Sequence, residues 1–288
     1  MNDSILSQSL PSLLERVPEA HPLVHCITNF VTVNDCANII LAAGGSPTMS
    51  RHPEEVAEIT SGCDALVLNM GTISDVEAML IAGRKANELG HPVILDPVGA
   101  GASAFRRNTA KQLLDSIHFA AIRGNATEIR YLSDGSGLEK GGVDADLSDR
   151  ITEDNAPRWA KLASALAARL KTVVCISGAT DIIADTSRAY AFPGGSPLMG
   201  RITGSGCMLT SLMGTYLGAV REAGPSEFLN ALLCAQAEMN AAGEIAEART
   251  AAAGGGTMTF RMHLIDAVSL MKKEQLQEYM KIHEVHFD

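Results

Sequence analysis

Short apolar runs rich in Val, Ile and Leu alternate along this chain with longer helical patterns, and this alternation limits the possible folds more than any other feature. Continuous apolar runs, bounded by Gly, Asp or Pro, are typical of strands buried on both faces. When helices join such strands, the strands lie parallel and the helices cover the sheet. The sequence therefore predicts a three-layer α/β fold with a mostly parallel central sheet flanked by helices.

The individual elements follow from the same pattern. Strands are predicted at Leu23–Thr28, Asp64–Asn69, Pro92–Asp96, Phe119–Arg123 and Thr172–Ser177. Helices are predicted at Asn34–Ala43, Asp75–Leu89, Ala126–Leu132 and Ala156–Leu170. Two short runs, Ile182–Asp185 and Arg188–Phe192, flank a Thr-Ser turn, which indicates an antiparallel hairpin at one edge of the sheet.

Three long apolar helices are predicted at Met208–Ala223, Ser226–Ala248 and Thr257–Met271. Ser226 and Thr257 are plausible N-caps, because their hydroxyls accept from free amides at a helix start. The segment Ser133–Ser148 is rich in Gly, Asp and Ser and is interpreted as a surface excursion. No linker or repeat interrupts the rest, so we expect one domain over residues 1–288.

Composition excludes several classes of protein. Hydrophobic residues make up 46% of the chain, enough for a sizeable core and too much for a disordered chain. The 23 basic and 33 acidic residues leave a net charge of -10, which argues against a nucleic-acid binder. The six cysteines form no C-x-x-C pair, and there is no secretory signal or membrane-length apolar run. We therefore expect a cytoplasmic protein with no membrane segment.

Polar residues follow several of the predicted strands, at the edge where parallel sheets bind ligands. Asn29, Asn69, Asp96 and Ser177 occupy such positions. Asp96 opens an Asp-Pro-Val-Gly sequence, which is also ordinary turn or helix-capping chemistry. Both interpretations of Asp96 remain open from its sequence context.

The segment Arg123–Glu128 combines a cation, a glycine and a carboxylate at the start of a predicted helix. Asn125 and Glu128 could form only an amide version of a capping box. Alternatively, Arg123 meets phosphate oxygens, and Glu128 with Asp96 holds a hydrated Mg²⁺, which takes one or two carboxylates plus substrate phosphates.

A glycine loop, Gly204-Ser205-Gly206, precedes Cys207 and a long apolar helix. Two glycines let the backbone approach a ligand, and a helix N-terminus attracts anions. No Gly-Lys-Ser/Thr occurs, which excludes a Walker-type P-loop. We expect Cys207 at the first helical position with a lowered pKa, the alternatives being tight helix packing and an inert buried thiol.

Two further residues have open interpretations. His25 lies on an apolar strand and is expected to be a hydrogen-bonded core residue, because the histidines show no metal-ligand spacing. Met49 could line a pocket for an aromatic ring or could belong to the core.

Together these motifs resemble the hydroxyethylthiazole kinase family, and the likeness runs from about His21 to beyond Met208. The motifs that carry it are Val24-His25-Cys26-Ile27-Thr28-Asn29, Asn29-Phe30-Val31-Thr32, Pro47-Thr48-Met49, Asp96-Pro97-Val98-Gly99, Arg123-Gly124-Asn125-Ala126-Thr127-Glu128 and Gly204-Ser205-Gly206-Cys207. The Asp-Pro-Val-Gly and Asn-x-x-Glu elements also resemble the wider ribokinase-like superfamily. There the loop usually ends in an Asp that serves as the base, whereas Cys207 stands here. The family often has Thr where this chain has Ser205, which keeps the hydroxyl.

The resemblance implies a ribokinase-like fold and Mg²⁺-dependent phosphoryl transfer from ATP to 4-methyl-5-(2-hydroxyethyl)thiazole, a salvage step in thiamine biosynthesis. It further implies homotrimers with each site at a subunit interface, so that Asn29 and Met49 serve a neighbour's pocket. The implied roles are substrate binding by Asn29, Met49 and Gly204, ATP binding by Arg123, Ser177 and Gly206, metal binding by Asp96 and Glu128, and a catalytic position for Cys207.

Two other functions stay open from the sequence. One is another small-alcohol or hydroxymethylpyrimidine-type kinase of the same superfamily. The other is a nucleotide-binding regulator without catalysis, although such a protein would not need both Asp96 and Glu128.

Overall fold

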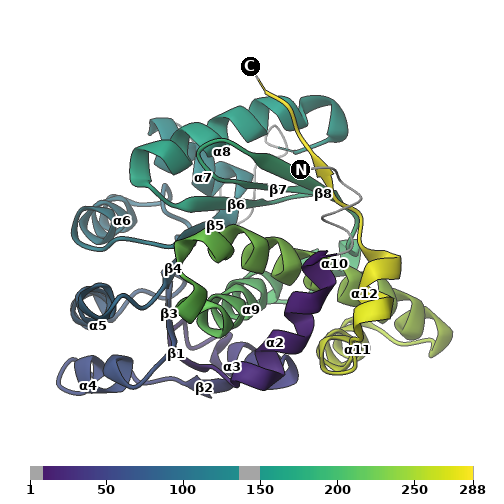
Figure 1. The fold of residues 1–288 in the computed structure, drawn as a ribbon, viewed down its shortest axis with the longest axis horizontal. Helices are drawn as coiled ribbons and strands as arrows, with labels where there is room; N and C mark the ends of the chain where they lie inside the picture. The colour runs from purple at the N-terminus through teal and green to yellow at the C-terminus, as the bar shows by residue number, and fades with distance from the viewer. Residues whose placement is uncertain (1–8, 136–149, 288) are drawn as a thin grey trace.

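The computed structural model describes residues 9–135 and 150–287 and contains a sheet of nine strands in that part of the chain (Figure 1). The strands are β1 Leu23–Ile27, β2 Ser46–Thr48, β3 Ala65–Asn69, β4 Val93–Asp96, β5 Ala121–Asn125, β6 Val173–Ser177, β7 Thr180–Ala184, β8 Ala189–Pro193 and β9 His283–Glu284. Their order is β2-β1-β3-β4-β5-β6-β7-β8-β9, and β2 through β6 pair in parallel. The pairs from β6 to β9 are antiparallel.

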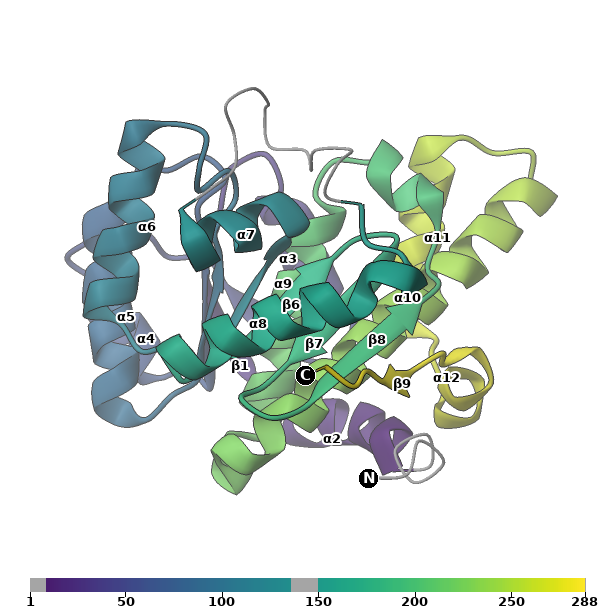
Figure 2. The same cartoon turned by 90° about the horizontal axis from the view of Figure 1, so that it is seen from above.

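Helices cover both faces of the sheet (Figures 1 and 2). One face carries α4 Val56–Ser61, α5 Val76–Leu89, α6 Ala104–Ser116, α7 Ala126–Asp134 and α8 Ala156–Leu170. The other carries α2 Leu13–Ala20, α3 Val33–Ala42, α9 Ser205–Ala219, α10 Phe228–Ala252, α11 Thr257–Ser269 and α12 Lys273–Tyr279. The predicted three-layer α/β fold with a mostly parallel sheet is therefore confirmed.

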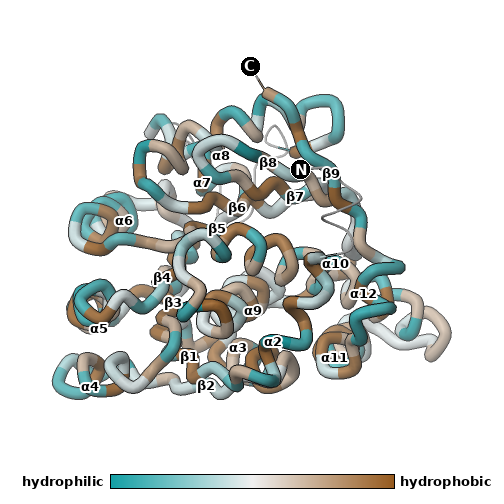
Figure 3. The backbone as a smooth tube through the Cα atoms, viewed as in Figure 1, coloured by the Kyte–Doolittle hydropathy of each residue, from teal (hydrophilic) through white to brown (hydrophobic). Residues whose placement is uncertain are grey.

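Alternating strand residues build two separate cores. In β3, Val67 packs into the core on the α9 side, whereas Leu66 and Leu68 pack into the core beneath α5 and α8. Figure 3, in which the backbone is coloured by the hydropathy of each residue, shows hydrophobic residues concentrated along the central strands and in helix α9. Since side chains alternate between sheet faces, apolar residues at every position require helices on both sides.

Helix α9 packs directly on the centre of the sheet, and a glycine makes this approach possible. A Cβ on Gly214 would stand 2.5 Å from a methyl of Val67, closer than atoms can pack. The helix contacts β1, β3 and β4, so its first turn lies at the carboxyl ends of these strands. This packing brings the glycine loop to the same edge as Asp96.

Several predictions from the sequence need correction. The hairpin β7–β8 is antiparallel as predicted, but β9 pairs outside β8 and therefore forms the edge. The N-caps of α10 and α11 are Glu227 and Gly256, not Ser226 and Thr257. Helix α10 begins two residues later than predicted, whereas α11 begins at Thr257, which is therefore its first helical residue and not its cap. Most of the predicted surface excursion, residues 136–149, lies outside the described residues.

The sequence pattern missed several short or weakly apolar elements, namely α2, α4, α6, α12, β2 and β9. His25 has the predicted core role: it is buried, with Nδ1 at 2.8 Å from Thr60 Oγ1 and Nε2 at 2.8 Å from Ser50 O. In the described parts of the chain, no helix has both the length and the apolar character required to cross a membrane.

A buried carboxyl group in α10 gives a test of this packing. Glu238 accepts a 2.9 Å hydrogen bond from Tyr216, and burial raises the pKa of Glu238 to about 8. The folded protein therefore keeps this proton up to about pH 8, whereas the unfolded chain loses it near pH 4.5. Folding stability from this group is highest at low pH and is lost as pH rises through 8.

We expect Glu238→Gln to raise the melting temperature at pH values above 8, because the amide has no proton to lose. Well below pH 4.5 the difference should almost vanish, since both states then hold the proton. Calorimetric melts at the two pH values check this. A variant that is less stable at both would mean that hydrogen bonding outweighs charge burial at this position.

Candidate active site

Polar side chains gather at the carboxyl edge of the sheet, where the sequence predicted a ligand site. Asn69, Asp96, Asn125 and Ser177 are the last residues of β3, β4, β5 and β6. Two cavities open here, of about 460 and 410 Å³, and the walls of both include Arg123, Ser205 and Gly206. The larger also holds Asp96, Glu128 and Cys207, and we call it the acceptor cavity; the smaller holds Ser177, and we call it the nucleotide cavity.

Asp96 is fully buried at the base of the acceptor cavity. Its Oδ2 accepts hydrogen bonds of 2.9 Å from both Asn69 Nδ2 and Thr210 Oγ1. Its Oδ1 is buried without a hydrogen-bond partner. Burial raises the pKa of Asp96, while Arg123, with Nη1 3.8 Å from Oδ2, acts in the opposite direction. A buried carboxylate oxygen with no donor is suited to binding a cation.

Glu128 forms the capping box of α7 and also lines the acceptor cavity. Its Oε2 accepts from the Asn125 amide at 2.8 Å, and its Oε1 accepts from the Gly99 amide at 2.8 Å. Burial and then the charge of Asp96 raise the pKa of Glu128 to about 7. The predicted capping box is confirmed, and it leaves Glu128 able to bind a cation as well, because each carboxylate oxygen has a further lone pair.

Arg123 lies between the two cavities and is held in place by Ser177. The Ser177 hydroxyl accepts from Arg123 Nε at 3.0 Å and from Nη2 at 2.6 Å. The guanidinium lies so close to the glycine loop that a Cβ on Gly206 would be 2.5 Å from Nη1. Gly206 thus permits a fixed cation to stand beside the loop.

The glycine loop adopts a conformation that presents its amides at the start of α9. Gly204 is the N-cap with φ of +87°, a left-handed geometry that favours glycine, and a Cβ there would be 2.7 Å from a methyl of Thr32. Ser205 and Gly206 occupy the first turn, whose amides have no helical partners. This loop and Arg123 together form an anion-binding surface facing both cavities.

Cys207, Asp96, Glu128 and the glycine loop thus line one cavity. Comparison with known proteins identifies the family of the chain. A sequence model of the hydroxyethylthiazole kinase family matches residues 14–274. The chain belongs to the hydroxyethylthiazole kinase family.

Individual hydroxyethylthiazole kinases cover nearly the whole chain. The one from Desulfovibrio desulfuricans is 49% identical over 269 residues, which is 90% of this chain and 92% of that protein. The one from Clostridium acetobutylicum is 44% identical over 271 residues, 93% and 97% of the two chains. The solved structure of hydroxyethylthiazole kinase from Pyrococcus horikoshii superposes with a TM-score of 0.81 at 34% identity, covering 96% and 99% of the two chains.

A more distant structure shows the fold alone. Pyridoxal kinase from Staphylococcus aureus, solved in complex with ADP, has a TM-score of 0.53 at 15% identity, covering 77% of this chain and 87% of that one. The ribokinase-like fold predicted from the resemblance is therefore confirmed.

Cys207, the residue that distinguishes hydroxyethylthiazole kinase motifs here, has a different environment than predicted. It is the third residue of α9 rather than the first, and burial and then Asp96 raise the pKa of its thiol to about 11. The expected lowering of its pKa is wrong, because desolvation and the buried Asp96 outweigh the helix N-terminus. Asn69 Nδ2 lies 3.3 Å and Asn29 Nδ2 3.5 Å from Sγ.

The structure brings together all but one of the predicted site residues. Asn29, Asp96, Glu128, Gly204 and Cys207 line the acceptor cavity, Ser177 lines the nucleotide cavity, and Arg123 and Gly206 line both. Met49 does not line either cavity of this single chain; it is partly buried against the core on the α9 side.

Residues that the sequence did not single out complete the site. Thr210 donates a hydrogen bond to Asp96. It lies four residues after Gly206 on the same face of the predicted helix, so the sequence could have placed it at the site. Arg106 donates to the carbonyls of Met70 and Val98 at 2.6 Å, tying the loops after β3 and β4 together. Only the tertiary structure shows this, since Arg106 lies in α6 on an otherwise ordinary polar helix.

The nucleotide cavity also contains a buried polar cluster. Asp181 Oδ2 accepts from Gln236 Nε2 and Asn240 Nδ2, each at 2.9 Å, and its Oδ1 accepts from the Gly178 amide at 3.0 Å. Burial raises the pKa of Asp181 to about 6. The carboxylate fixes both amide side chains in the cavity wall.

Proposed function

We propose that this chain transfers the γ-phosphoryl group of ATP to the primary hydroxyl of 4-methyl-5-(2-hydroxyethyl)thiazole, a salvage step of thiamine biosynthesis. The observation that carries the proposal is the wall shared by the two cavities, where Arg123 and Gly206 lie. A group moving between a nucleotide in one cavity and an alcohol in the other must pass this anion-binding surface. Family membership then favours the thiazole alcohol as the acceptor.

The residues at the site suit this reaction. Phosphoryl transfer requires mainly positioning and neutralisation of charge on the transferring group, because little covalent help is needed. The loop amides after Gly204 and the Arg123 guanidinium meet the phosphate oxygens as the bond to the alcohol oxygen forms and the bond to ADP breaks. These donors are already in place, so no reorganisation is needed in the transition state.

Asp96 and Glu128 fit Mg²⁺ as the metal ion. Asp96 Oδ1 is buried without a partner, and the charge of Asp96 raises the pKa of Glu128, so a cation bound between them would stabilise the ionised forms. Mg²⁺ usually takes only one or two carboxylates together with substrate phosphates, so these two residues are enough. Mg²⁺ would neutralise phosphate charge.

The test of this function is an assay of ADP formation with purified protein, ATP, Mg²⁺ and the thiazole alcohol. The matched control is 4-methyl-5-ethylthiazole, which has the same ring and lacks the hydroxyl. ADP formation only with the alcohol, and its loss on removal of Mg²⁺, is the expected result. A hydroxymethylpyrimidine that turns over faster would favour the neighbouring kinase activity, and ATP binding without ADP from any alcohol would favour a regulator.

Cys207 acts in this proposal by positioning the acceptor hydroxyl. A thiol with a pKa near 11 is neutral at pH 7, so it is a poor base at rest. We expect Cys207→Ala to keep activity at about one tenth to one hundredth of the parent kcat, on the scale of general acid–base effects.

We expect Cys207→Asp to remain active and to exceed Cys207→Ala. The amides of Asn29 and Asn69 already face Sγ and can donate to a carboxylate, which accepts the alcohol proton more readily than a thiol. The opposing effect is repulsion from Asp96 and the phosphates. Steady-state kcat of both variants, with circular dichroism to check folding, decides the point. A folded Asp variant below the Ala variant would show that repulsion dominates.

We also propose a cytoplasmic homotrimer with active sites at subunit interfaces. Exposed apolar side chains support an interface beside the acceptor cavity: Phe30 and Val31 precede α3, Leu41 lies in α3, and Met258 and Met262 lie in the neighbouring α11. Met49 of a neighbouring chain would then complete the pocket. Sedimentation at micromolar concentration should report three chains per particle, and a fully active single chain would contradict the proposal.

A further inference from the structure

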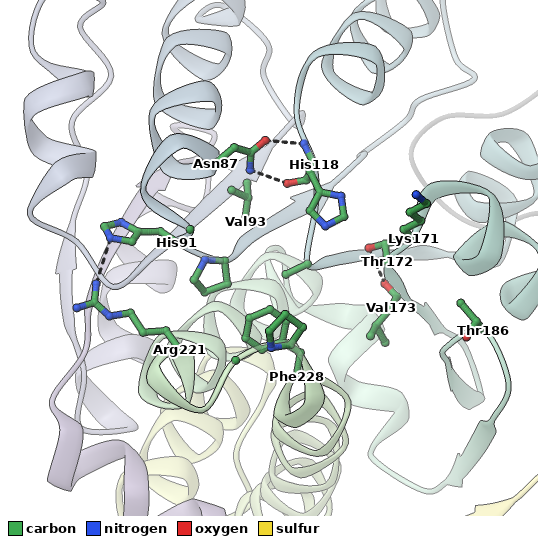
Figure 4. Close-up of a pocket in the computed structure, with 15 residues that line it drawn as sticks. Asn87, His91, Val93, His118, Lys171, Thr172, Val173, Thr186, Arg221 and Phe228 are labelled. Carbon is green, nitrogen blue, oxygen red and sulfur yellow. Dashed lines mark hydrogen bonds between the residues drawn. The ribbon is translucent and has the colours of Figure 1, made fainter.

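A third cavity, drawn in Figure 4, is lined by residues at the beginnings of the strands, the opposite edge of the sheet from the active site. Its volume is about 660 Å³, larger than either active-site cavity. Val93 and Val173, the first residues of β4 and β6, form part of its wall, whereas the active-site residues follow the ends of these strands. The length of the strands therefore separates the two sites, and this cavity takes no part in the proposed phosphoryl transfer.

The floor of this cavity is apolar and partly aromatic. Phe228, at the start of α10, and Val93 lie on this side of the cavity (Figure 4). Pro92 also lines it. Phe228 is only partly buried in the described chain. A half-exposed ring beside a proline and aliphatic side chains offers a flat surface on which a planar apolar group can pack.

The ionisable side chains that line this cavity are all basic. His91, His118, Lys171 and Arg221 line it, and no Asp or Glu is among the described residues that do. The chain as a whole has an excess of ten acidic residues, so this basic lining is a local departure from its overall charge. Such a lining favours an anionic ligand.

Two of the four basic side chains, His91 and Arg221, already have partners in the protein, and the other two do not. Arg221 already pairs with Asp64 at 3.2 Å and Glu222 at 3.0 Å, and its Nη1 lies 3.2 Å from His91 Nε2. Burial, and then the charge of Arg221, lower the pKa of His91. At this end of the cavity the charge of Arg221 is therefore already balanced by Asp64 and Glu222. In the described residues, the Lys171 ammonium and the His118 ring have no hydrogen-bond or ion-pair partner, which leaves them for a ligand.

The backbone around the free pair is fixed. Asn87 Nδ2 donates to His118 O at 2.8 Å, and the His118 amide donates to Asn87 Oδ1 at 2.6 Å (Figure 4). Lys171 caps α8 with φ of +53°, a conformation that usually selects glycine or asparagine. A lysine here presents a cation from a fixed turn instead of a flexible loop.

We propose that this cavity binds a small aromatic anion, a single planar ring that carries a phosphate or carboxylate. The ring packs against Phe228 and Pro92, and the anionic group binds Lys171 and His118. The site is separate from the one that binds ATP, so the two ligands bind together.

The test is calorimetric titration of the full chain with phenyl phosphate, with inorganic phosphate and phenol as part-ligands. Phenyl phosphate should bind saturably and about tenfold more tightly than either part, since ring and anion each contribute. Excess ATP should leave its affinity unchanged. Lys171→Gly should weaken binding about tenfold, the scale of one charge-assisted hydrogen bond. Glycine adopts the Lys171 conformation freely, so this variant should fold.

Two further variants separate charge from structure. Lys171→Arg should stay within about twofold of the parent, because it keeps the cation. Lys161→Gln, which removes an exposed cation from the same helix outside the cavity, should change nothing. The proposal is overturned if phenyl phosphate does not bind saturably, if inorganic phosphate binds as tightly, if ATP displaces it, or if Lys171→Gly binds as the parent does.

Discussion

Replacing Arg123 with alanine is expected to lower kcat/KM for ATP by about a hundredfold to a thousandfold, with both a higher KM and a lower kcat. Arg123 is the one side-chain cation in the wall shared by the two cavities among the described residues. Its hydrogen bonds to phosphate oxygens strengthen as charge moves during transfer, so ground-state and transition-state binding both suffer. Steady-state kinetics with varied ATP measure the two parameters.

Graded variants test whether the guanidinium itself is responsible. Arg123→Lys should recover only part of the loss, because a point charge replaces a planar fork. Ser177→Ala should cause a smaller loss, of about tenfold or less, because it removes only the hydroxyl that fixes the fork. The exposed Arg84, on α5, supplies the control, and Arg84→Ala should leave ATP kinetics unchanged. Unchanged ATP kinetics in Arg123→Ala would place this side chain outside the site.

The pH dependence of the Arg123→Ala variant independently tests the effect of the Arg123 charge on Asp96. The positive charge of Arg123 lowers the pKa of Asp96, opposing the effect of burial. Without it the pKa of Asp96 rises further, so the acid limb of the rate profile should move to higher pH. A profile that keeps its shape would mean that Asp96 ionisation does not limit the reaction.

Asp96→Asn is expected to reduce kcat by at least about a hundredfold while the folded protein becomes no less stable. The amide oxygen can still accept from Asn69 and Thr210, so the local hydrogen bonds survive. The lost charge removes one of the two carboxylates proposed for Mg²⁺. Burial raises the pKa of Asp96, so the ionised carboxylate destabilises the folded state at neutral pH. This destabilisation disappears only at low pH, where Asp96 is protonated, and the Asn variant lacks it at every pH.

Opposite changes in activity and stability distinguish a functional carboxylate from a structural one. Melting temperature and kcat measured on the same Asp96→Asn preparation check both, and the Mg²⁺ concentration needed for half-maximal rate should rise. Glu238→Gln is the matched control, since it replaces another buried carboxyl group by an amide outside both active-site cavities and should leave kcat unchanged. An active Asp96→Asn enzyme with unaltered Mg²⁺ dependence would remove Asp96 from the metal site.

The sequence by itself determined the layer order and most of the site. Apolar runs such as Leu66–Leu68 predicted buried parallel strands because burial on both faces leaves no polar alternation. Asp96 and Ser177 were found because they end such strands, and the parallel arrangement brings strand ends to one edge. The motif around Arg123 and Glu128 is local in sequence, so its capping geometry could be predicted too.

Only the tertiary structure decided the electrostatics and the long-range contacts. The pKa of Cys207 depends on burial and on Asp96, which lies more than a hundred residues away along the chain, so helix position alone predicted the wrong direction. Arg106 ties the loops after β3 and β4 together through packing that no local pattern encodes. The cavity at Lys171 and Phe228 joins residues from separate elements, and its basic lining emerges only when those elements fold together.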